Sequence, residues 1–165
     1  MLRNPENIPM FFVDAMLGNI ARKLRLLGYD SKYFSDINDT KLIDIAIKDK
    51  RIIISKDYKL IIRAKKIGIP TIHITKQKLI EQFFELTNKI CLKNFEINGN
   101  IARCTKCNTQ TESIDKNNYK EKIPLGVFNL NENYWRCKNC DKIYWEGTHI
   151  KNLQVFVGQI NERLQ

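Results

Sequence analysis

Short apolar runs alternate with amphipathic segments along the first ninety residues, and this order predicts strands that alternate with helices. The runs typical of buried strands are 10–15 (MFFVDA), 31–34 (SKYF), 51–55 (RIIIS) and 70–74 (PTIHI). The segments with helical periodicity are 16–28, 38–50, 58–67 and 76–92. Such alternation is typical of an α/β fold with a parallel sheet, right-handed crossovers and helices on both faces.

Two of these helices carry an apolar stripe that predicts which face is buried. The stripes comprise Leu17, Ile20, Ala21, Leu24 and Leu27 in the first helix and Leu42, Ile43, Ala46 and Ile47 in the second. Gly28 and Gly68 follow the first and third helices, where glycine commonly ends a helix. Asp39 or Thr40 is expected to cap the start of the second helix.

Four acidic residues follow the first three predicted strands. Asp14 ends the first strand, Asp36 lies two residues past the second, Asp39 begins the next helix and Asp57 lies two residues past the third. Ligands of open parallel sheets bind at the carboxyl ends of the strands. Because clustered carboxylates repel one another, such a cluster predicts a bound cation, Mg²⁺ or Mn²⁺. The alternative is that Asp39 and Asp57 cap helices and Asp14 accepts hydrogen bonds at its strand end.

The net charge of the chain indicates a class of binding partner. The formal net charge is +10 and the pI is about 9.4, which favours a polyanion such as RNA. A biased Lys-, Asn- and Ile-rich composition would give the same charge without that partner. The apolar runs are too short to span a bilayer, and the first residues lack the apolar core of an export signal. We therefore expect a cytoplasmic protein without membrane contact.

Paired cysteines mark a second domain. We place a first domain at 1–92 and a second domain at 93–165, where the composition shifts toward Asn, Thr and Lys. Two C-x₂-C pairs, CTKC (104–107) and CKNC (137–140), flank a long spacer at 108–136. Their cysteines, predicted to hold one structural Zn²⁺, are Cys104, Cys107, Cys137 and Cys140. Disulfides are the less favoured alternative, because no export signal is evident.

Two further features of the second domain complete the pattern. An aromatic strand ending in YWEGTH leads into a C-terminal helix, which is predicted to pack on the first domain. Its apolar stripe is Ile150, Leu153, Val157, Ile160 and Leu164. His149, at the start of this helix, is either a structural residue or a substrate or metal ligand. Cys91 is expected to be a small core residue.

These motifs together resemble the Mut-seven C-terminal RNase domain family, a PIN-like nuclease fold with a zinc ribbon. The resemblance rests on FFVDAMLGNIARKLRLLGYD, on SKD after an apolar strand, on the two cysteine pairs and on YWEGTH, and it covers residues 10–153. It implies a metal-dependent ribonuclease whose acids include Asp14 and Asp57. The family places adjacent acids after the second strand, whereas here Asn38 precedes Asp39, so either Asp36 or Asp39 would complete the site.

The expected reaction is phosphodiester hydrolysis of RNA with one or two Mg²⁺ or Mn²⁺ ions. Ser55 would orient Asp57 or a water, or only satisfy a backbone group. Basic residues expected to bind RNA phosphates are Arg22, Lys23, Arg25, Lys56, Lys59 and Arg63. The alternative is a non-catalytic RNA-binding module with a degenerate PIN-like site; a toxin-like PIN nuclease is a third and weaker hypothesis. RNA-processing proteins are candidate protein partners.

Overall fold

The computed structural model describes residues 8–90 and 95–164. The chain divides into two compact units, which we call the first unit (Met1–Arg25 with Tyr29–Leu92) and the second unit (Leu26–Gly28 with Lys93–Gln165). Within the described ranges, no helix combines the length and the apolar character needed to cross a bilayer. The cytoplasmic location stays a prediction, and Cys91 lies outside the described residues.

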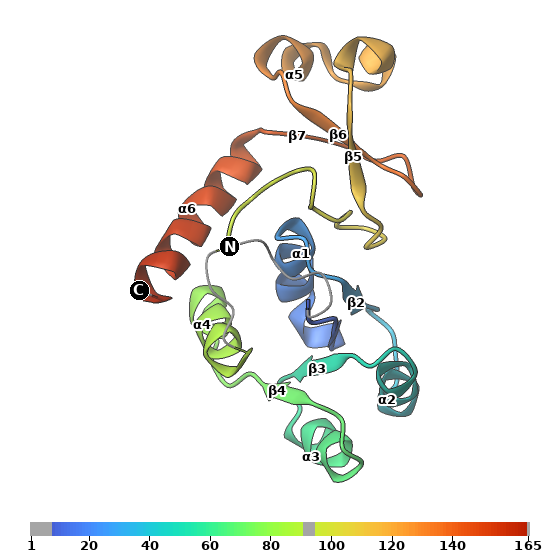
Figure 1. Ribbon diagram of the computed structural model, residues 1–165, viewed down its shortest axis with the longest axis vertical. Helices are drawn as coiled ribbons and strands as arrows, with labels where there is room; N and C mark the ends of the chain where they lie inside the picture. Colours follow the sequence, from blue (N-terminus) through green and yellow to red (C-terminus); the bar gives the residue numbers. More distant parts are fainter. Residues whose placement is uncertain (1–7, 91–94, 165) are drawn as a thin grey trace. The chain divides into compact units, whose positions relative to one another are not determined.

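A four-stranded parallel sheet forms the centre of the first unit (Figure 1). Its strands, in the spatial order β2-β1-β3-β4, are β1 (Phe11–Val13), β2 (Ser31–Tyr33), β3 (Ile52–Ser55) and β4 (Thr71–His73). The helices are the 3₁₀ turn η2 (Ala15–Leu17), α1 (Gly18–Leu26), α2 (Asp39–Lys48), α3 (Tyr58–Lys66) and α4 (Leu79–Ile90). The predicted α/β fold with a parallel sheet is therefore confirmed.

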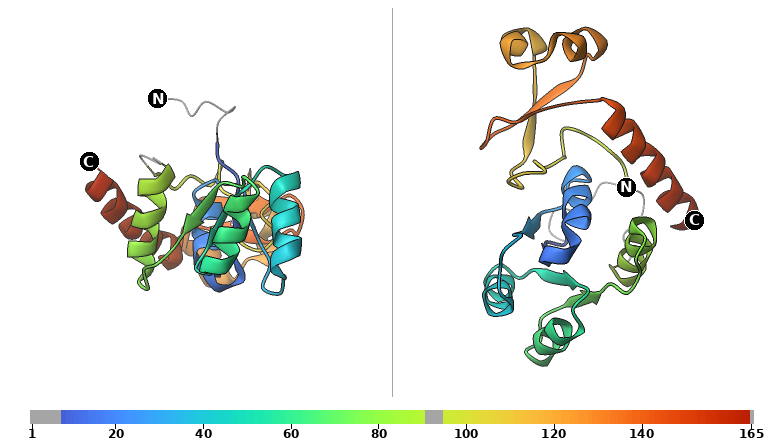
Figure 2. Two further views of the ribbon diagram at one scale, coloured as in Figure 1. Left: turned by 90° about the horizontal axis from the view of Figure 1, so that it is seen from below. Right: turned by 180° about the vertical axis from the view of Figure 1, so that it is seen from behind.

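Helices cover both faces of this sheet, as Figures 1 and 2 show from three sides. On one face, Phe12 and Ile53 form a core cluster with residues of α2 and α3: Leu42, Ile43, Ala46, Leu60 and Ala64. α1 lies on the opposite face, and all five predicted inward residues of its stripe are buried. In α2 the prediction is wrong for Ile47, which is 53% exposed because it lies beside the buried stripe rather than on it.

The helix ends follow local backbone chemistry. Gly28 and Gly68 adopt positive φ of 88° and 81°, and the next amides, of Tyr29 and Ile69, donate back to Leu24 and Ala64. The start of α2 differs from the prediction. Asn38 caps it by accepting from the Lys41 amide at 2.9 Å, and Asp39 and Thr40 lie within its first turn.

A buried arginine links several residues at the end of the sheet where the strands begin. Arg51 is 5% exposed and its guanidinium donates to Asp30 at 2.5 Å, to the Phe11 carbonyl at 3.1 Å and to Asp49 at 3.2 Å. Lys32 also donates to Asp49. Hydrogen bonds from Lys32 and Arg51 hold the pKa of Asp49 below its usual value. The stability from Asp49 is therefore present at neutral pH and is lost as the pH falls through that lowered pKa.

Replacing Arg51 with Met should lower the free energy of unfolding by about 3 kcal/mol, because a half-buried acid and a buried carbonyl lose their donor. Urea denaturation of the full chain measures this change. The matched control is Arg22→Met, since Arg22 is exposed on α1 and its loss should change stability by less than about 0.5 kcal/mol. Equal midpoints for both variants would contradict a structural role for Arg51.

The second unit is built on a three-stranded antiparallel sheet. Its elements are β5 (Thr111–Ile114), β6 (Tyr134–Cys137), β7 (Ile143–Trp145), the 3₁₀ helix η3 (Lys116–Lys122), α5 (Leu125–Leu130) and α6 (Thr148–Leu164). The spacer between the two cysteine pairs thus forms β5, η3 and α5 before β6 begins. Leu153, Val157 and Ile160 of the α6 stripe are buried. Packing of α6 on the first domain stays a prediction.

Candidate functional site

The strand order of the first unit creates a switch point between β1 and β3. The chain leaves β1 through α1 toward β2, whereas it leaves β3 through α3 toward β4 on the other side. Ligands of open α/β sheets bind in the crevice outside such a point. We call the residues at and just after the four strand ends the carboxyl edge. They are Asp14, Phe34, Ser55–Asp57 and His73.

Asp14 stands at the end of β1, where both of its carboxylate oxygens are held. Oδ1 accepts from the Ala15 amide at 2.6 Å and caps η2. Oδ2 accepts from the Ser55 hydroxyl at 2.6 Å. The backbone amide of Asp14 also donates to the Ile54 carbonyl, which continues the pairing of β1 with β3. The carboxylate therefore has a fixed orientation beside the end of β3.

Ser55 connects Asp14 to Asp57. Ser55 is fully buried; its hydroxyl donates to Asp14 and accepts from the Asp57 amide at 2.9 Å. Asp57 is exposed and caps α3, because its Oδ1 accepts from the amides of Lys59 at 2.7 Å and Leu60 at 3.2 Å. Both capping bonds end on Oδ1. Ser55 thus orients the Asp14 carboxylate and the Asp57 backbone, rather than the Asp57 side chain.

The other two predicted acids occupy different surroundings. Asp36 is exposed in the turn after β2. Asp39 pairs with Arg63 of α3 at 3.4 Å. Within the described ranges, the four paired cysteines are the only group of three or more acidic, cysteine or histidine side chains whose ligand atoms come within 4.8 Å of one another. The structure therefore links Asp14 with Asp57 through Ser55, but it does not bring three acids together.

The predicted phosphate-binding residues divide by exposure. Arg25 is a correction: it is 4% exposed, and its Nε donates to the Ser31 carbonyl at 2.8 Å, so it supports the fold instead of facing RNA. Arg22 is exposed on the same helix, and Lys23 is half-buried, which lowers the pKa of its ammonium group. Lys56 at the carboxyl edge reaches Gln77 at 3.1 Å. His149 is exposed in the first turn of α6.

Sequence reasoning missed three rings at the carboxyl edge. Phe34 is 48% exposed and contacts Phe12 with a ring-centroid distance of 5.9 Å. Tyr58 is 62% exposed, and its ring lies 5.5 Å from that of His73. The His73 ring also lies within hydrogen-bond distance of the Lys56 carbonyl, at 3.2 Å. The available signal was their position: Phe34 directly follows β2, His73 ends β4, and Tyr58 begins α3 next to Asp57.

The four predicted zinc ligands of the second unit do meet. The sulfur atoms of Cys104 and Cys140 are 3.5 Å apart, those of Cys107 and Cys137 are 3.3 Å apart, and those of Cys107 and Cys140 are 3.7 Å apart. A disulfide would need about 2.05 Å. Four thiolates around Zn²⁺, with Zn–S bonds of about 2.3 Å, lie roughly 3.8 Å from one another. The cluster therefore fits a tetrahedral metal such as Zn²⁺.

Both cysteine pairs have the same backbone geometry. In each pair, the backbone amide of the first cysteine donates to the carbonyl five residues on, from Cys104 to Thr109 and from Cys137 to Lys142. The residues after the second cysteines, Asn108 and Asp141, have positive φ of 67° and 57°. These turns aim backbone amides at sulfur, as at Cys104, which accepts from the Lys106 amide at 3.4 Å. Such bonds favour thiolates, the form that binds a metal.

The acidities of the thiols differ across the cluster. Burial opposes ionisation of Cys107, but hydrogen bonds from Thr109 outweigh it and lower its pKa to about 6. Burial raises the pKa of Cys137 to about 12. The Tyr144 hydroxyl lies 3.1 Å from the Cys104 sulfur and donates to it. A bound cation would stabilise all four thiolates together, and Tyr144 would support one of them from outside.

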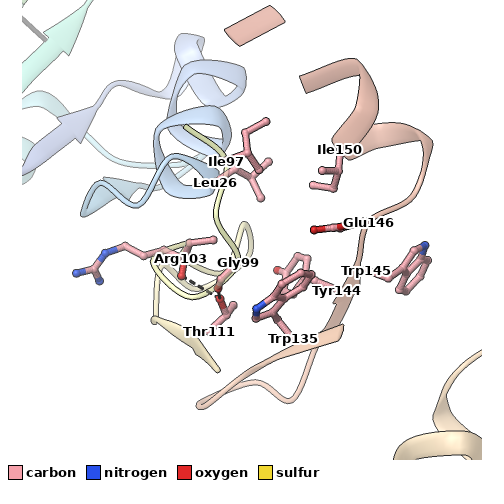
Figure 3. A pocket seen from close by; sticks show the side chains of 11 residues that line it. Leu26, Ile97, Gly99, Arg103, Thr111, Trp135, Tyr144, Trp145, Glu146 and Ile150 are labelled. Atoms are coloured by element: carbon pink, nitrogen blue, oxygen red, sulfur yellow. Dashed lines mark hydrogen bonds between the residues drawn. The ribbon is translucent and has the colours of Figure 1, made fainter. Parts of the chain in front are cut away.

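A small apolar pocket lies beside this sheet (Figure 3). Trp135 and Tyr144 are cross-strand partners of β6 and β7 and lie side by side in its wall, with Ile97 and Ile150 on another side. Its volume is about 40 Å³. This is room for very few water molecules and far below the roughly 300 Å³ of a typical small-molecule site. We therefore assign no ligand to it.

Comparison with known proteins places the whole arrangement in a family. The family model described as Mut7-C RNAse domain matches residues 9–157, nearly the whole chain. This match confirms the resemblance inferred from the motifs. No curated protein and no solved structure gives a significant match to the chain.

Proposed function

Because the chain belongs to the Mut7-C RNAse domain family, we propose that it is a ribonuclease that hydrolyses RNA phosphodiester bonds at the carboxyl edge of the first unit. The family description supports a nuclease that acts on RNA. The net charge of +10 supports a polyanionic substrate. The site, the metal requirement and the residue roles are our proposal.

One observation carries the choice of site: buried Ser55 ties the Asp14 carboxylate to the loop that presents Asp57, at the switch point of the sheet. A serine that only filled a backbone vacancy would not need to donate to a strand-end carboxylate at 2.6 Å. The Asp14 carboxylate is therefore held in a fixed orientation beside the loop that presents Asp57, which suits a reaction at a fixed phosphate.

The two carboxylates of Asp14 and Asp57 suit a Mg²⁺ or Mn²⁺ ion that is also bound by substrate. They are too few for a site built from protein ligands alone. Mg²⁺ is commonly bound through one or two carboxylates together with substrate phosphates. Asp14 and Asp57 would hold such an ion, and Asp57 could do so through Oδ2, since its capping bonds use Oδ1. When bound, a divalent ion neutralises phosphate charge and acidifies an attacking water. Asp36 is our candidate for a third acid, because Asp39 is paired with Arg63.

The remaining residues of the chain bind and orient. Ser55 fixes the Asp14 carboxylate, and Lys56, Lys59 and Arg22 offer charge to RNA phosphates. In the second unit the four cysteines would hold structural Zn²⁺, because four thiolates leave no coordination position for a water.

A second candidate function is a non-catalytic RNA-binding module. The observation that favours it is that three carboxylates do not converge in the described structure. The two candidates differ in whether a divalent ion turns RNA binding into cleavage.

The test is a cleavage assay of the full chain on single-stranded and structured RNAs in buffer alone, with Mg²⁺, with Mn²⁺ and with EDTA. The ribonuclease proposal expects cleavage with Mg²⁺ or Mn²⁺, loss in EDTA, and recovery when excess Mg²⁺ or Mn²⁺ is added back. Recovery that requires Zn²⁺ instead would point to the second unit as the sensitive part. RNA binding without cleavage under every metal condition would favour the binding module.

A further inference from the structure

The carboxyl edge presents one residue from each strand in a row across the sheet. Ser55 pairs with His73, and Val13 pairs with both Ile54 and Tyr33. Continuing the register by one residue places Asp14 beside Ser55 on one side, as their hydrogen bond confirms, and beside Phe34 on the other. In strand order the row is Phe34, Asp14, Ser55 and His73. Neighbours in it are separated by about 4.8 Å, the spacing of strands.

Exposed aromatic rings stand at both ends of this row. Phe34 lies at one end, supported from below by Phe12. Tyr58 lies at the other end, supported by His73 and placed in the first turn of α3 directly after Asp57. Asp14 lies between the two ends of the row. Each ring is held by a neighbouring ring yet leaves about half or more of its surface exposed, at 48% for Phe34 and 62% for Tyr58.

Two rings that flank a phosphate-cleaving site match the chemistry of an RNA strand, in which a base lies on either side of each phosphate. Bases stack on aromatic side chains with any sequence, because every base has a π face. Bases in a duplex are already stacked on their neighbours and paired, so only an unpaired segment offers them to protein rings.

We infer that Phe34 and Tyr58 are two base-stacking sites that hold an unpaired RNA segment across the carboxyl edge, with the phosphate to be cleaved over Asp14. This inference rests on the proposed function, and it adds the path of the RNA. The RNA segment crosses the edge between β2 and β4, perpendicular to the β-strands. Lys56 and Lys59, beside Tyr58, would contact the flanking phosphates. Phe34 and Tyr58 are positioning residues, because they touch bases and not the reacting bond.

The experiment measures binding and cleavage separately, with the full chain and at fixed salt. The variants Phe34→Leu and Tyr58→Leu keep apolar volume but remove the ring, whereas Phe34→Tyr and Tyr58→Phe keep it. Binding to oligoadenylate and to a blunt-ended RNA duplex is measured by fluorescence anisotropy without added Mg²⁺ or Mn²⁺. The matched control is Ile67→Ala, because Ile67 is 56% exposed at the opposite end of the same helix, α3.

Each leucine variant should bind oligoadenylate about 5- to 150-fold more weakly, and each aromatic variant should bind as the wild type does. Duplex binding by the leucine variants should change little, and so should oligoadenylate binding by the Ile67→Ala protein. Unchanged oligoadenylate affinity in both leucine variants, or an equal loss in Ile67→Ala, would overturn the inference. Loss of duplex and single-strand affinity by the same factor would overturn it as well.

Cleavage by the wild type separates this inference from the proposed function. Metal-dependent cleavage together with ring-independent binding would keep the ribonuclease and remove the stacking sites. Ring-dependent binding of oligoadenylate without cleavage in any metal would support the stacking sites and contradict the ribonuclease.

Discussion

Replacing Cys137 with Ser should abolish stoichiometric zinc binding and strongly lower the melting temperature of the protein. Cys137 is fully buried, and its sulfur lies 3.3 Å from that of Cys107 within the four-cysteine cluster. Structural Zn²⁺ sites couple metal binding to folding, with an apparent binding free energy of roughly 10 kcal/mol or more. Few other single changes in this chain remove an interaction of that size. Metal analysis of reduced protein and thermal melting provide the two readouts.

Two further variants make this result specific. Asn139→Ala changes an exposed side chain in the same turn but keeps the amide that donates to Cys137, so zinc content and melting temperature should not change. Tyr144→Phe removes only the hydroxyl that donates to Cys104, and should weaken zinc affinity by about 10- to 100-fold. Wild-type protein purified without zinc, or a Cys137→Ser protein that melts like the wild type, would contradict the assignment.

Cleavage by an Asp57→Asn variant should fall by about 100-fold or more, while its folding is preserved. Asparagine keeps an oxygen that can accept from the amides of Lys59 and Leu60, so the cap of α3 survives. It lacks the negative charge proposed to hold the divalent ion, and losing a direct ligand should cost more than losing an outer-shell partner. Thermal melting and Mn²⁺-dependent RNA cleavage are measured on the same preparation.

The alanine variant separates the two roles of Asp57. Asp57→Ala should lose both the charge and the cap, so that cleavage falls equally and stability drops by about 1 kcal/mol. Asp44→Asn is the matched control, because it removes one negative charge from an exposed position on α2 and should leave cleavage unchanged. Wild-type cleavage by Asp57→Asn would leave Asp57 as a helix cap only.

The cysteine cluster and the acidic residues differ in how much of their structure could be predicted from the sequence. The C-x₂-C spacing predicted all four members of the cysteine cluster, because each pair is a local turn that brings two thiols to one point and a tetrahedral metal needs two such pairs. The acids were harder. Their positions after strands predicted a common edge, yet the sequence could not show that Asp57 caps α3 or that Asp39 pairs with Arg63 from another helix.

The sequence also could not show which of its basic residues are buried. Arg22, Lys23 and Arg25 are close in sequence and equally basic, and helical periodicity alone placed all of them as candidates for RNA binding. The packed structure buries Arg25 against the Ser31 carbonyl and leaves Arg22 exposed. Long basic side chains can follow either course, and Arg25 is buried because the carbonyl of Ser31, at the start of β2, accepts from it.

The sequence by itself determined the order of strands and helices, the buried stripe of α1, the glycine-terminated helix ends and the turn of each cysteine pair, because each depends on local periodicity or backbone conformation. Only the tertiary structure decided which strands are neighbours. That choice places Asp14 between Phe34 and Ser55 and sets the hydrogen bond from Ser55 to Asp14. The physical reason is that these contacts join residues far apart in sequence, and strand order and register, which no local signal encodes, bring them together.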